Sequence, residues 1–160
     1  MPGSAATRVR FSVSAAALAA LLLLSCAAAA PPQRTELVPY TIVGDSIPAS
    51  LTGGNGNPAS GRAIVVDPQR GMCLLCHSGP FPEDKFQGNI GPNLAGVGRR
   101  LSEGQLRLRV VDSSKINPDT IMPPFYRLDA LHRVASPWRG KPVLTAAEIE
   151  DVVAFLMTLK

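Results

Sequence analysis

Cys73-Leu74-Leu75-Cys76-His77 is the stretch of sequence that decides the fold of this chain. It is a C-x-x-C-H sequence, the attachment motif of a c-type haem, in which two thiols add to the two vinyl groups of one porphyrin. The two intervening residues let one turn of backbone span that edge, and the next residue, His77, then falls at the iron and can donate an imidazole nitrogen. The motif therefore predicts one covalently bound haem c held by Cys73, Cys76 and His77.

Three other chemistries use a C-x-x-C pair. A structural zinc site needs four ligands, and the only other candidates are His77, adjacent to Cys76, and His132. A thioredoxin-like redox pair needs a strand–helix–strand setting, and that pattern is not found near residue 73. A plain disulfide explains both cysteines but leaves His77 without a role. Haem attachment accounts for all three side chains and is the favoured interpretation.

The first 30 residues have the pattern of a secretory signal peptide. Arg8 and Arg10 precede an apolar run over residues 15–24, and small residues follow it. This is the order of a positive region, a hydrophobic region and a cleavage zone. The run is too short to span a bilayer comfortably. We expect removal of residues 1–30 and export to the periplasm, which fits a haem that is attached after the chain crosses the membrane.

Cys26 leaves two forms of cleavage open. Leu23-Leu24-Ser25-Cys26 resembles a lipoprotein cleavage box, in which the cysteine becomes the lipidated first residue. The alternative is ordinary cleavage among the alanines that follow, which discards Cys26. A membrane anchor is expected only in the first case.

Composition after residue 30 is that of one small domain without a strong charge. About 130 of the 160 residues remain, which is long enough for a single core. Because Arg8 and Arg10 belong to the signal, 14 of the 16 Lys and Arg remain against 12 Asp and Glu, and no basic stripe with interleaved aromatic residues indicates nucleic acid. Once Cys73 and Cys76 hold the haem, no thiol remains after residue 30. Thiolate chemistry would then have to come from another chain.

Two segments are predicted after the signal. Residues 31–56 are rich in proline and glycine and show no sustained period, so we expect an extended N-terminal arm or partner-binding strap. Residues 57–160 contain the helical signals. Between those signals the chain is again rich in proline and glycine, and no alternating strand pattern is found. The predicted fold class is therefore all-α.

Three helices are expected in residues 57–160. The first has Asn57 as its cap and a first-turn proline, and ends before Pro68; its small Gly61 would let another helix approach closely. Capping boxes over residues 102–105 and 145–148 begin the other two. The last helix has an apolar stripe at i, i+3, i+4 and i+7, which predicts one buried face. The stripe consists of Ile149, Val152, Val153 and Leu156.

The second iron ligand is expected from a methionine, because a Met/His pair is the usual arrangement for electron transfer. Met72 abuts the attachment motif and cannot reach the opposite face of a haem, and Met157 lies in the last helix, where a core role is expected. Met122 remains, and the prolines that follow it would fix its loop. The alternatives are that Met122 only packs on the haem, or that His132 or Lys115 is the ligand.

The arrangement resembles the class I cytochrome c fold, in which an N-terminal helix leads into C-x-x-C-H and crosses the C-terminal helix. Gly91-Pro92-Asn93-Leu94 is similar to a segment that passes beside the proximal histidine in that family. The resemblance implies that the Pro92 carbonyl accepts the other N–H of His77 and orients its ring. The alternative is a simple turn.

Three longer stretches resemble the SoxX family, the small monohaem cytochrome subunits of SoxAX complexes in bacterial thiosulfate oxidation. They are residues 86–92, residues 102–124 and residues 139–145. The resemblance covers about residues 57–160. It includes loop sequence that haem binding alone does not require.

This resemblance implies an electron-transfer role in an enzyme complex, an L-cysteine S-thiosulfotransferase. The SoxA partner would form a heterodimer with this chain and would carry the site where thiosulfate is joined oxidatively to a cysteine of the SoxYZ carrier. The present chain would take the released electrons and pass them to a downstream cytochrome, with no catalytic residue of its own. A free-standing periplasmic electron carrier and a haem enzyme or gas sensor are the rival functions.

Surface contacts near the haem are expected from two places. One is the loop after Met122, with Phe125 and Tyr126, and the other is the segment around Leu74-Leu75. Trp138 has two interpretations, an anchor at a protein interface or a core residue that shields the haem.

Overall fold

A computed structural model describes residues 36–160 of the chain. Over this range it contains helices and one isolated β-bridge, between Val43 and Ser46, and no strand. The predicted all-α class is thus confirmed for this part of the chain. The elements are α2 (Pro58–Val66), η1 (Cys73–Leu75), α3 (Val97–Arg100), α4 (Glu103–Asp112), η2 (Ser113–Lys115), η3 (Ser136–Trp138) and α5 (Ala146–Thr158).

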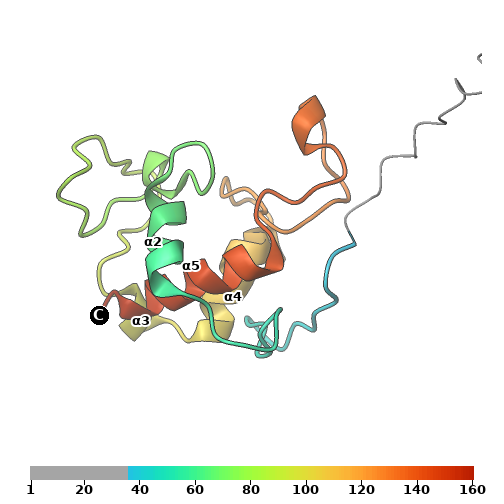
Figure 1. The fold of residues 1–160 in the computed structure, drawn as a ribbon, viewed down its shortest axis with the longest axis horizontal. Coiled ribbons are helices and arrows are strands. Elements are labelled where there is room, and N and C mark those ends of the chain that lie inside the picture. The colour runs from blue at the N-terminus through green and yellow to red at the C-terminus, as the bar shows by residue number, and fades with distance from the viewer. Residues whose placement is uncertain (1–35) are drawn as a thin grey trace, which may run out of the picture. The chain divides into compact units, whose positions relative to one another are not determined.

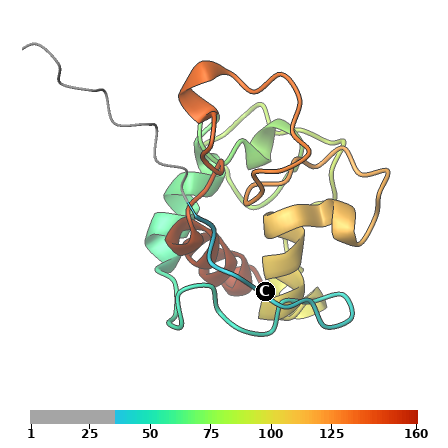
Figure 2. The same ribbon diagram turned by 90° about the vertical axis from the view of Figure 1, so that its right-hand side faces the viewer.

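Helix α5 is the element on which the others pack, and the two views of the ribbon show α2 crossing it and α4 beside it (Figures 1 and 2). It begins at the predicted capping box. The Thr145 amide donates to Glu148 Oε2 at 2.8 Å, and the Glu148 amide donates to Thr145 Oγ1 at 3.3 Å. The predicted stripe is buried, with Ile149 at 0% exposure. The box fixes the start of the helix, and the stripe fixes which face lies inward.

The crossing of α2 over α5 depends on a small residue at the contact. A Cβ added at Gly61 would overlap the Asp151 carbonyl in the α5 backbone. The start of α2 is tied to the same turn of α5, because the Asn57 amide donates to Asp151 Oδ1 at 2.6 Å. The Asn57 side chain in turn caps the Ala59 and Ser60 amides. The predicted role of Gly61 is therefore confirmed, and the crossing sets the direction in which the chain enters the Cys73 motif.

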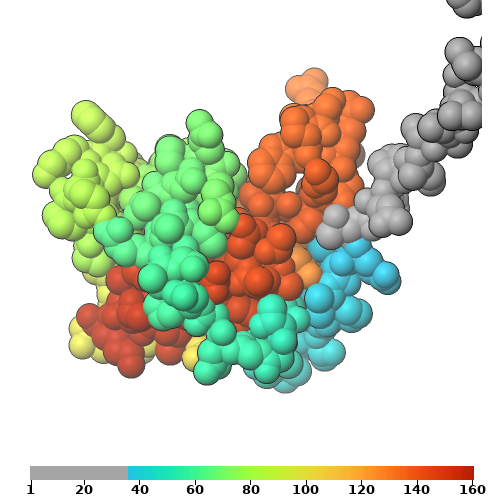
Figure 3. Space-filling view, in the orientation of Figure 1, coloured from blue at the N-terminus to red at the C-terminus, as the bar shows by residue number. Residues whose placement is uncertain are grey.

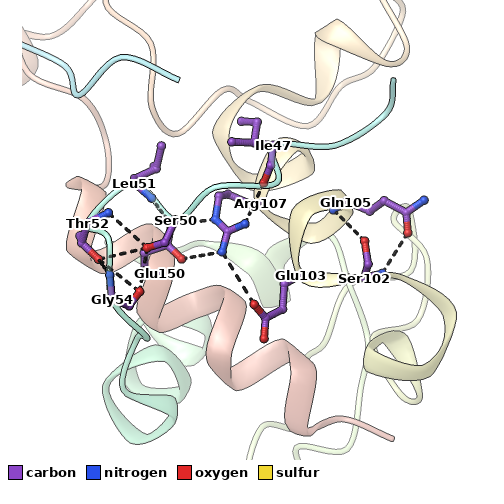
Figure 4. Close-up of polar contacts among 10 residues, drawn as sticks. All are labelled: Ile47, Ser50, Leu51, Thr52, Gly54, Ser102, Glu103, Gln105, Arg107 and Glu150. Atoms are coloured by element: carbon purple, nitrogen blue, oxygen red, sulfur yellow. Dashed lines mark hydrogen bonds and ion pairs between the residues drawn. The ribbon is translucent and has the colours of Figure 1, made fainter. Parts of the chain in front are cut away.

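Helix α4 begins at the other predicted capping box, between Ser102 and Gln105. Its Arg107 is 3% exposed and forms a two-pronged ion pair with Glu150 of α5, which is also 3% exposed. Both contacts measure 2.8 Å between nitrogen and oxygen. Figure 4 shows that this pair also forms hydrogen bonds with the segment before α2: Arg107 donates to the Ile47 carbonyl, and the Leu51 amide donates to Glu150. The pair therefore joins three parts of the chain.

Residues 36–56 form no helix, and part of this segment packs into the core. Ile47 is fully buried and Leu51 is 5% exposed. The Ile47 amide also donates to the Gly104 carbonyl of α4 at 2.9 Å. A separate N-terminal arm over residues 31–56 stays a prediction, and residues 31–35 lie outside the described range.

The connection from α4 to α5 is held by backbone hydrogen bonds rather than by regular structure. The Phe125 and Tyr126 amides donate to the Val110 and Val111 carbonyls, and the Leu144 amide donates back to Phe125 at 3.0 Å. Phe125 and Tyr126 are 4% and 3% exposed, so the expectation that they line the surface near the haem was wrong. Both side chains pack in the hydrophobic core. The Tyr126 hydroxyl also accepts a hydrogen bond from the Val38 amide at 2.9 Å.

The predicted signal peptide over residues 1–30, with Cys26, lies outside the described residues. From residue 36 onward, none of the helices is long and apolar enough to cross a membrane.

Candidate haem site

The Cys73 motif is a single tight turn that follows α2 after the connection over residues 67–72. Met72 takes a left-handed conformation with φ 56°, which redirects the chain into η1. The Cys76 and His77 amides both donate to the Cys73 carbonyl, at 3.2 and 2.9 Å. Cys73 and Cys76 are free thiols, so the disulfide alternative does not describe this structure. The turn presents two thiols and an imidazole within five residues.

The Cys73 thiol lies in apolar surroundings. Burial raises the pKa of this thiol to about 12, and the neighbouring Cys76 adds to the increase. Redox-active C-x-x-C pairs instead lower the pKa of one thiol to form a reactive thiolate. Cys73 thus lacks the lowered pKa of a reactive thiolate, and residues 36–160 contain no strand of the kind that a thioredoxin-like setting needs.

His77 is held by a contact with the backbone of Pro92. Its Nδ1 lies 2.7 Å from the Pro92 carbonyl oxygen, which can only accept a hydrogen bond. The proton therefore sits on Nδ1, and Nε2 keeps its lone pair for a metal. A Cβ added at Gly91 would overlap the His77 ring, so glycine is needed where this segment passes. The Pro92 contact that the class I resemblance implies is present, and the role of Pro92 toward an iron stays a prediction.

The motif opens onto a cavity of about 750 Å³. This volume lies in the usual range for a small-molecule or cofactor site. Cys73, Cys76, His77, Pro92 and Met122 all line it, so the five side chains predicted from sequence meet at one place. Most of the wall is apolar, from α3, α4, α5 and the loops between them. The other apolar lining residues include Leu75, Ile90, Leu94, Val97, Leu101, Leu106, Val110, Ile116, Ile121, Phe125 and Leu156.

Met122 is half-buried in the wall formed by the loop after η2. The Met122 amide donates to Thr120 Oγ1 at 3.2 Å, and two prolines follow it. Met72 lines the same cavity beside the attachment motif, whereas Met157, Lys115 and His132 do not line it. The rivals named from sequence are thus less well placed than Met122, and ligation by Met122 stays a prediction.

Two arginines of the cavity wall were missed by sequence reasoning. Arg100 is the last residue of α3 and donates to the Asn93 carbonyl at 2.7 Å, and Arg109 on α4 donates to the Gln105 carbonyl at 2.9 Å. Both line the cavity. Guanidinium groups pair well with carboxylates, and a haem carries two propionates. Their position within helices that show no basic pattern gave no signal in the sequence.

These residues fit a covalently bound haem. Two unpaired thiols stand next to a histidine whose Nδ1 contacts the Pro92 carbonyl and whose Nε2 is left for a metal, and a thioether lies in the wall of the same apolar cavity. Imidazole and thioether together are a common axial set for haem iron. Among residues 36–160, no cluster of three or more His, Cys, Asp or Glu side chains could hold a metal ion.

Comparison with known proteins identifies the family. The chain is similar to a chain in the crystal structure of SoxXA from P. pantotrophus, with 39% sequence identity and a TM-score of 0.72. The match covers 80% of this chain and 99% of that chain. This chain belongs to the SoxX family. A scan against protein-family models and a search of curated protein sequences found no match.

The SoxX resemblance drawn from sequence is therefore confirmed, and with it the cytochrome c type of fold. Of the three SoxX-like stretches, two supply the cavity wall: residues 86–92 contribute Ile90, Gly91 and Pro92, and residues 102–124 contribute Met122. The third, residues 139–145, leads into the capping box of α5.

Proposed function

We propose that this chain is the electron-accepting c-type cytochrome subunit of a SoxAX complex. One observation carries the proposal: a chain of the SoxX family brings two free thiols, an oriented histidine and a thioether to one apolar cavity. A haem c bound there would supply reversible one-electron chemistry at its iron. The whole complex would act as an L-cysteine S-thiosulfotransferase, with SoxA carrying the bond-forming site.

The side chains of this chain have separate roles in the proposal. Cys73 and Cys76 would hold the haem through thioether bonds. His77 would offer Nε2 to the iron while Nδ1 donates to Pro92, and Met122 would supply the second axial ligand. The apolar wall would exclude water, and Arg100 and Arg109 would meet the propionates.

The electrons would come from a reaction on the partner. When thiosulfate is joined to the carrier cysteine of SoxYZ, one S–S bond forms, the thiol proton leaves and two electrons are released. This chain would accept them one at a time and pass each to a downstream cytochrome. A site closed by both His77 and Met122 would leave no position for substrate, which is consistent with a relay rather than a catalytic centre.

The proposal places the protein in the periplasm as a heterodimer with SoxA. Residues 1–30 would direct export, and the fate of Cys26 would decide whether a lipid anchor is present. Purification of the untagged native protein tests these points together. We expect elution with a larger cytochrome and an intact mass with one haem, while the N-terminal mass reports on Cys26. Isolation as a lone haem-bearing monomer would instead support the free-standing carrier.

The electron-transfer role is tested by mixing the oxidised complex anaerobically with thiosulfate and SoxYZ. The proposal expects haem reduction that needs all three components. Met122→Ala tests the second ligand: the variant should bind CO when reduced and have a lower potential, because a thioether favours Fe(II). Met157→Ala is the control, since Met157 does not line the cavity. Ready CO binding by the unaltered protein would support a haem enzyme or gas sensor and contradict the proposal.

A further inference from the structure

Residues 129–141 leave the body of the domain and return to it, and we call this segment the basic lobe. The segments that flank it are joined, because the Leu144 amide donates to the Phe125 carbonyl at 3.0 Å. Within the lobe only Val134 is partly buried, and every other residue is exposed. The ribbon and space-filling views show this orange segment standing away from α4 and α5 (Figures 1 and 3).

The lobe is ordered by its own backbone rather than by a core. It contains the short helix η3, and the Trp138 amide donates to the Ala135 carbonyl at 2.9 Å. Arg139 Nε donates to the Val134 carbonyl at 3.4 Å. Two residues other than glycine take left-handed conformations, Ala130 at φ 51° and Arg133 at φ 58°. Such conformations are unfavourable for these residues and concentrate at functional positions. The lobe therefore carries a conformational free-energy cost that packing within this domain does not offset.

Large apolar side chains of the lobe face solvent. Trp138 is 43% exposed and Leu131 is 37% exposed. Trp138 does not line the cavity, so the interpretation as a core residue that shields the haem was wrong. The short helix η3 carries the residue outward instead of toward α5. An exposed tryptophan on an ordered support is typical of the anchor of a protein interface.

The net positive charge of residues 36–160 comes from the lobe. Arg133, Arg139 and Lys141 are exposed and form no ion pair within residues 36–160, while Asp129 is the single anion of the lobe. The described range has 13 Lys and Arg against 12 Asp and Glu. Without the lobe the count is 10 against 11, so the lobe is net positive on a domain that is otherwise slightly negative.

From these observations we infer that the basic lobe is a docking surface for an acidic protein, with Trp138 as its apolar anchor. Three unpaired cations around a tryptophan complement a patch of carboxylates with an apolar centre, and such complementarity steers encounter and suits a transient partner. A membrane surface is less well matched, because polybasic segments that bind anionic lipid carry about four to eight Lys and Arg. This docking site goes beyond the electron route proposed above and does not depend on it.

The inference is tested by titrating the full-length, reduced holo-chain with plastocyanin, a small acidic protein. Trp138 is the single tryptophan of the chain, so its indole N–H gives one NMR signal that reports on the lobe. We expect a saturable shift of this signal at low salt, and a Kd about tenfold weaker at 0.3 M salt because the charges are screened. Lysozyme, a basic protein, should cause no shift.

Charge-matched variants separate the lobe from net charge. The lobe variant Arg133→Gln/Arg139→Gln/Lys141→Gln should bind plastocyanin about tenfold more weakly at low salt, as measured by calorimetry. The control variant Lys85→Gln/Arg99→Gln/Lys160→Gln removes three exposed cations from elsewhere and should change the Kd less than about twofold. All six side chains are exposed, and unchanged circular dichroism verifies folding.

An anchor variant tests the apolar part of the surface. Trp138→Ala should weaken binding about fivefold at both salt concentrations, because burial of the ring is not screened. Three results would overturn the inference: equal weakening by the lobe and control variants, an unshifted indole signal at saturating plastocyanin, or no binding at low salt. Binding to vesicles with anionic lipid that is lost in the lobe variant, without plastocyanin binding, would assign the lobe to a membrane instead.

Discussion

The buried ion pair between α4 and α5 and the wall of the cavity are two interior regions with opposite construction. At the ion pair, Arg107 and Glu150 satisfy each other in a two-pronged contact and also bond the Ile47 carbonyl and the Leu51 amide (Figure 4). At the cavity, side chains from several elements face a space of about 750 Å³ that none of them crosses. One region is completed by the chain itself, and the other is shaped for a second molecule.

This difference shows that the two regions have separate structural roles. Charges in a protein interior are tolerated when every donor and acceptor has a partner, which makes the Arg107–Glu150 pair a specific connector of three segments. An apolar wall gains stability only from the surface that covers it. The ion pair therefore positions α4 and α5, and these two helices in turn hold the wall of the proposed haem cavity in place.

The largest effect is expected from Cys73→Ala/Cys76→Ala, which would prevent the proposed attachment of a haem. Without a haem, the apolar wall of the cavity of about 750 Å³ would face water instead of a cofactor. A domain of this size is stable by only about 5–15 kcal/mol. We expect loss of helical circular dichroism and cooperative unfolding. Phe86→Ala, at a residue 93% exposed that does not line the cavity, is the control and should keep both. A cooperatively folded double variant without haem would show that the cavity wall is stable without a cofactor.

The connector is tested by Glu150→Ala, which leaves the Arg107 guanidinium buried and unpaired. We expect a loss of about 3–5 kcal/mol in the free energy of unfolding of the holoprotein, measured with denaturant. Glu103→Ala is a matched control: Glu103 lies 4.0 Å from the same guanidinium but is 63% exposed. It should cost less than about 1 kcal/mol. Equal losses would mean that burial does not distinguish the two contacts.

A double variant, Arg107→Met/Glu150→Leu, sharpens the same point. Replacing both charges removes the buried unpaired group and should recover most of the loss caused by Glu150→Ala. Recovery should be incomplete, since the Leu51 amide and the Ile47 carbonyl would lose their partners. Full recovery would show that the pair does not hold the segment before α2.

The next effect concerns the helix crossing that leads the chain into the cavity. Gly61→Ala would force a methyl group into the Asp151 carbonyl of α5, and we expect a loss of about 1–3 kcal/mol from overpacking. Gly54→Ala is the control, because nothing lies within 4 Å of an added Cβ there. It should change stability by less than about 0.5 kcal/mol. The result would be contradicted by equal stability of the two variants.

Local signals in the sequence predicted the helices and the cavity residues well. In the capping boxes, the partner of Ser102 or Thr145 lies three residues later in the sequence, so both contacts could be predicted. The spacing of the stripe that starts at Ile149 likewise predicts which face of the helix is buried. The five predicted residues line one cavity. They could be predicted together because the Cys73 motif and the class I resemblance both concern the binding of one cofactor.

Contacts between residues far apart in the sequence could not be predicted from these local signals. Glu150 follows Ile149 on the buried side of α5, and only the structure pairs it with Arg107, 43 residues earlier. Ile47 and Leu51 lie in a segment without a period, so their burial could not be inferred from pattern. Tyr126 was expected at the surface, but its hydroxyl accepts the amide of Val38, 88 residues away. Each of these contacts depends on how distant segments meet.

The smallest effect is expected at the start of α5, where an ionised capping box contrasts with the neutral box of α4. Burial would raise the pKa of Glu148, but hydrogen bonds from Thr145 and Arg70 outweigh it and lower the pKa below its usual 4.5. Because the folded-state pKa is lowered, this carboxylate stabilises the protein above about pH 4.5, and its contribution is lost as the pH falls through the folded value. Glu148→Gln keeps the shape but not the charge.

We therefore expect Glu148→Gln to cost about 0.5–1 kcal/mol at pH 7 and less at pH 3, measured by denaturant unfolding at each pH. Ser102→Ala is the control, because it removes the cap of α4, whose partner Gln105 is a neutral amide. Its cost of about 1 kcal/mol should be similar at both pH values. A cost of Glu148→Gln that does not change with pH would mean that the charge adds nothing to the box. The two caps would then stabilise their helices by geometry alone.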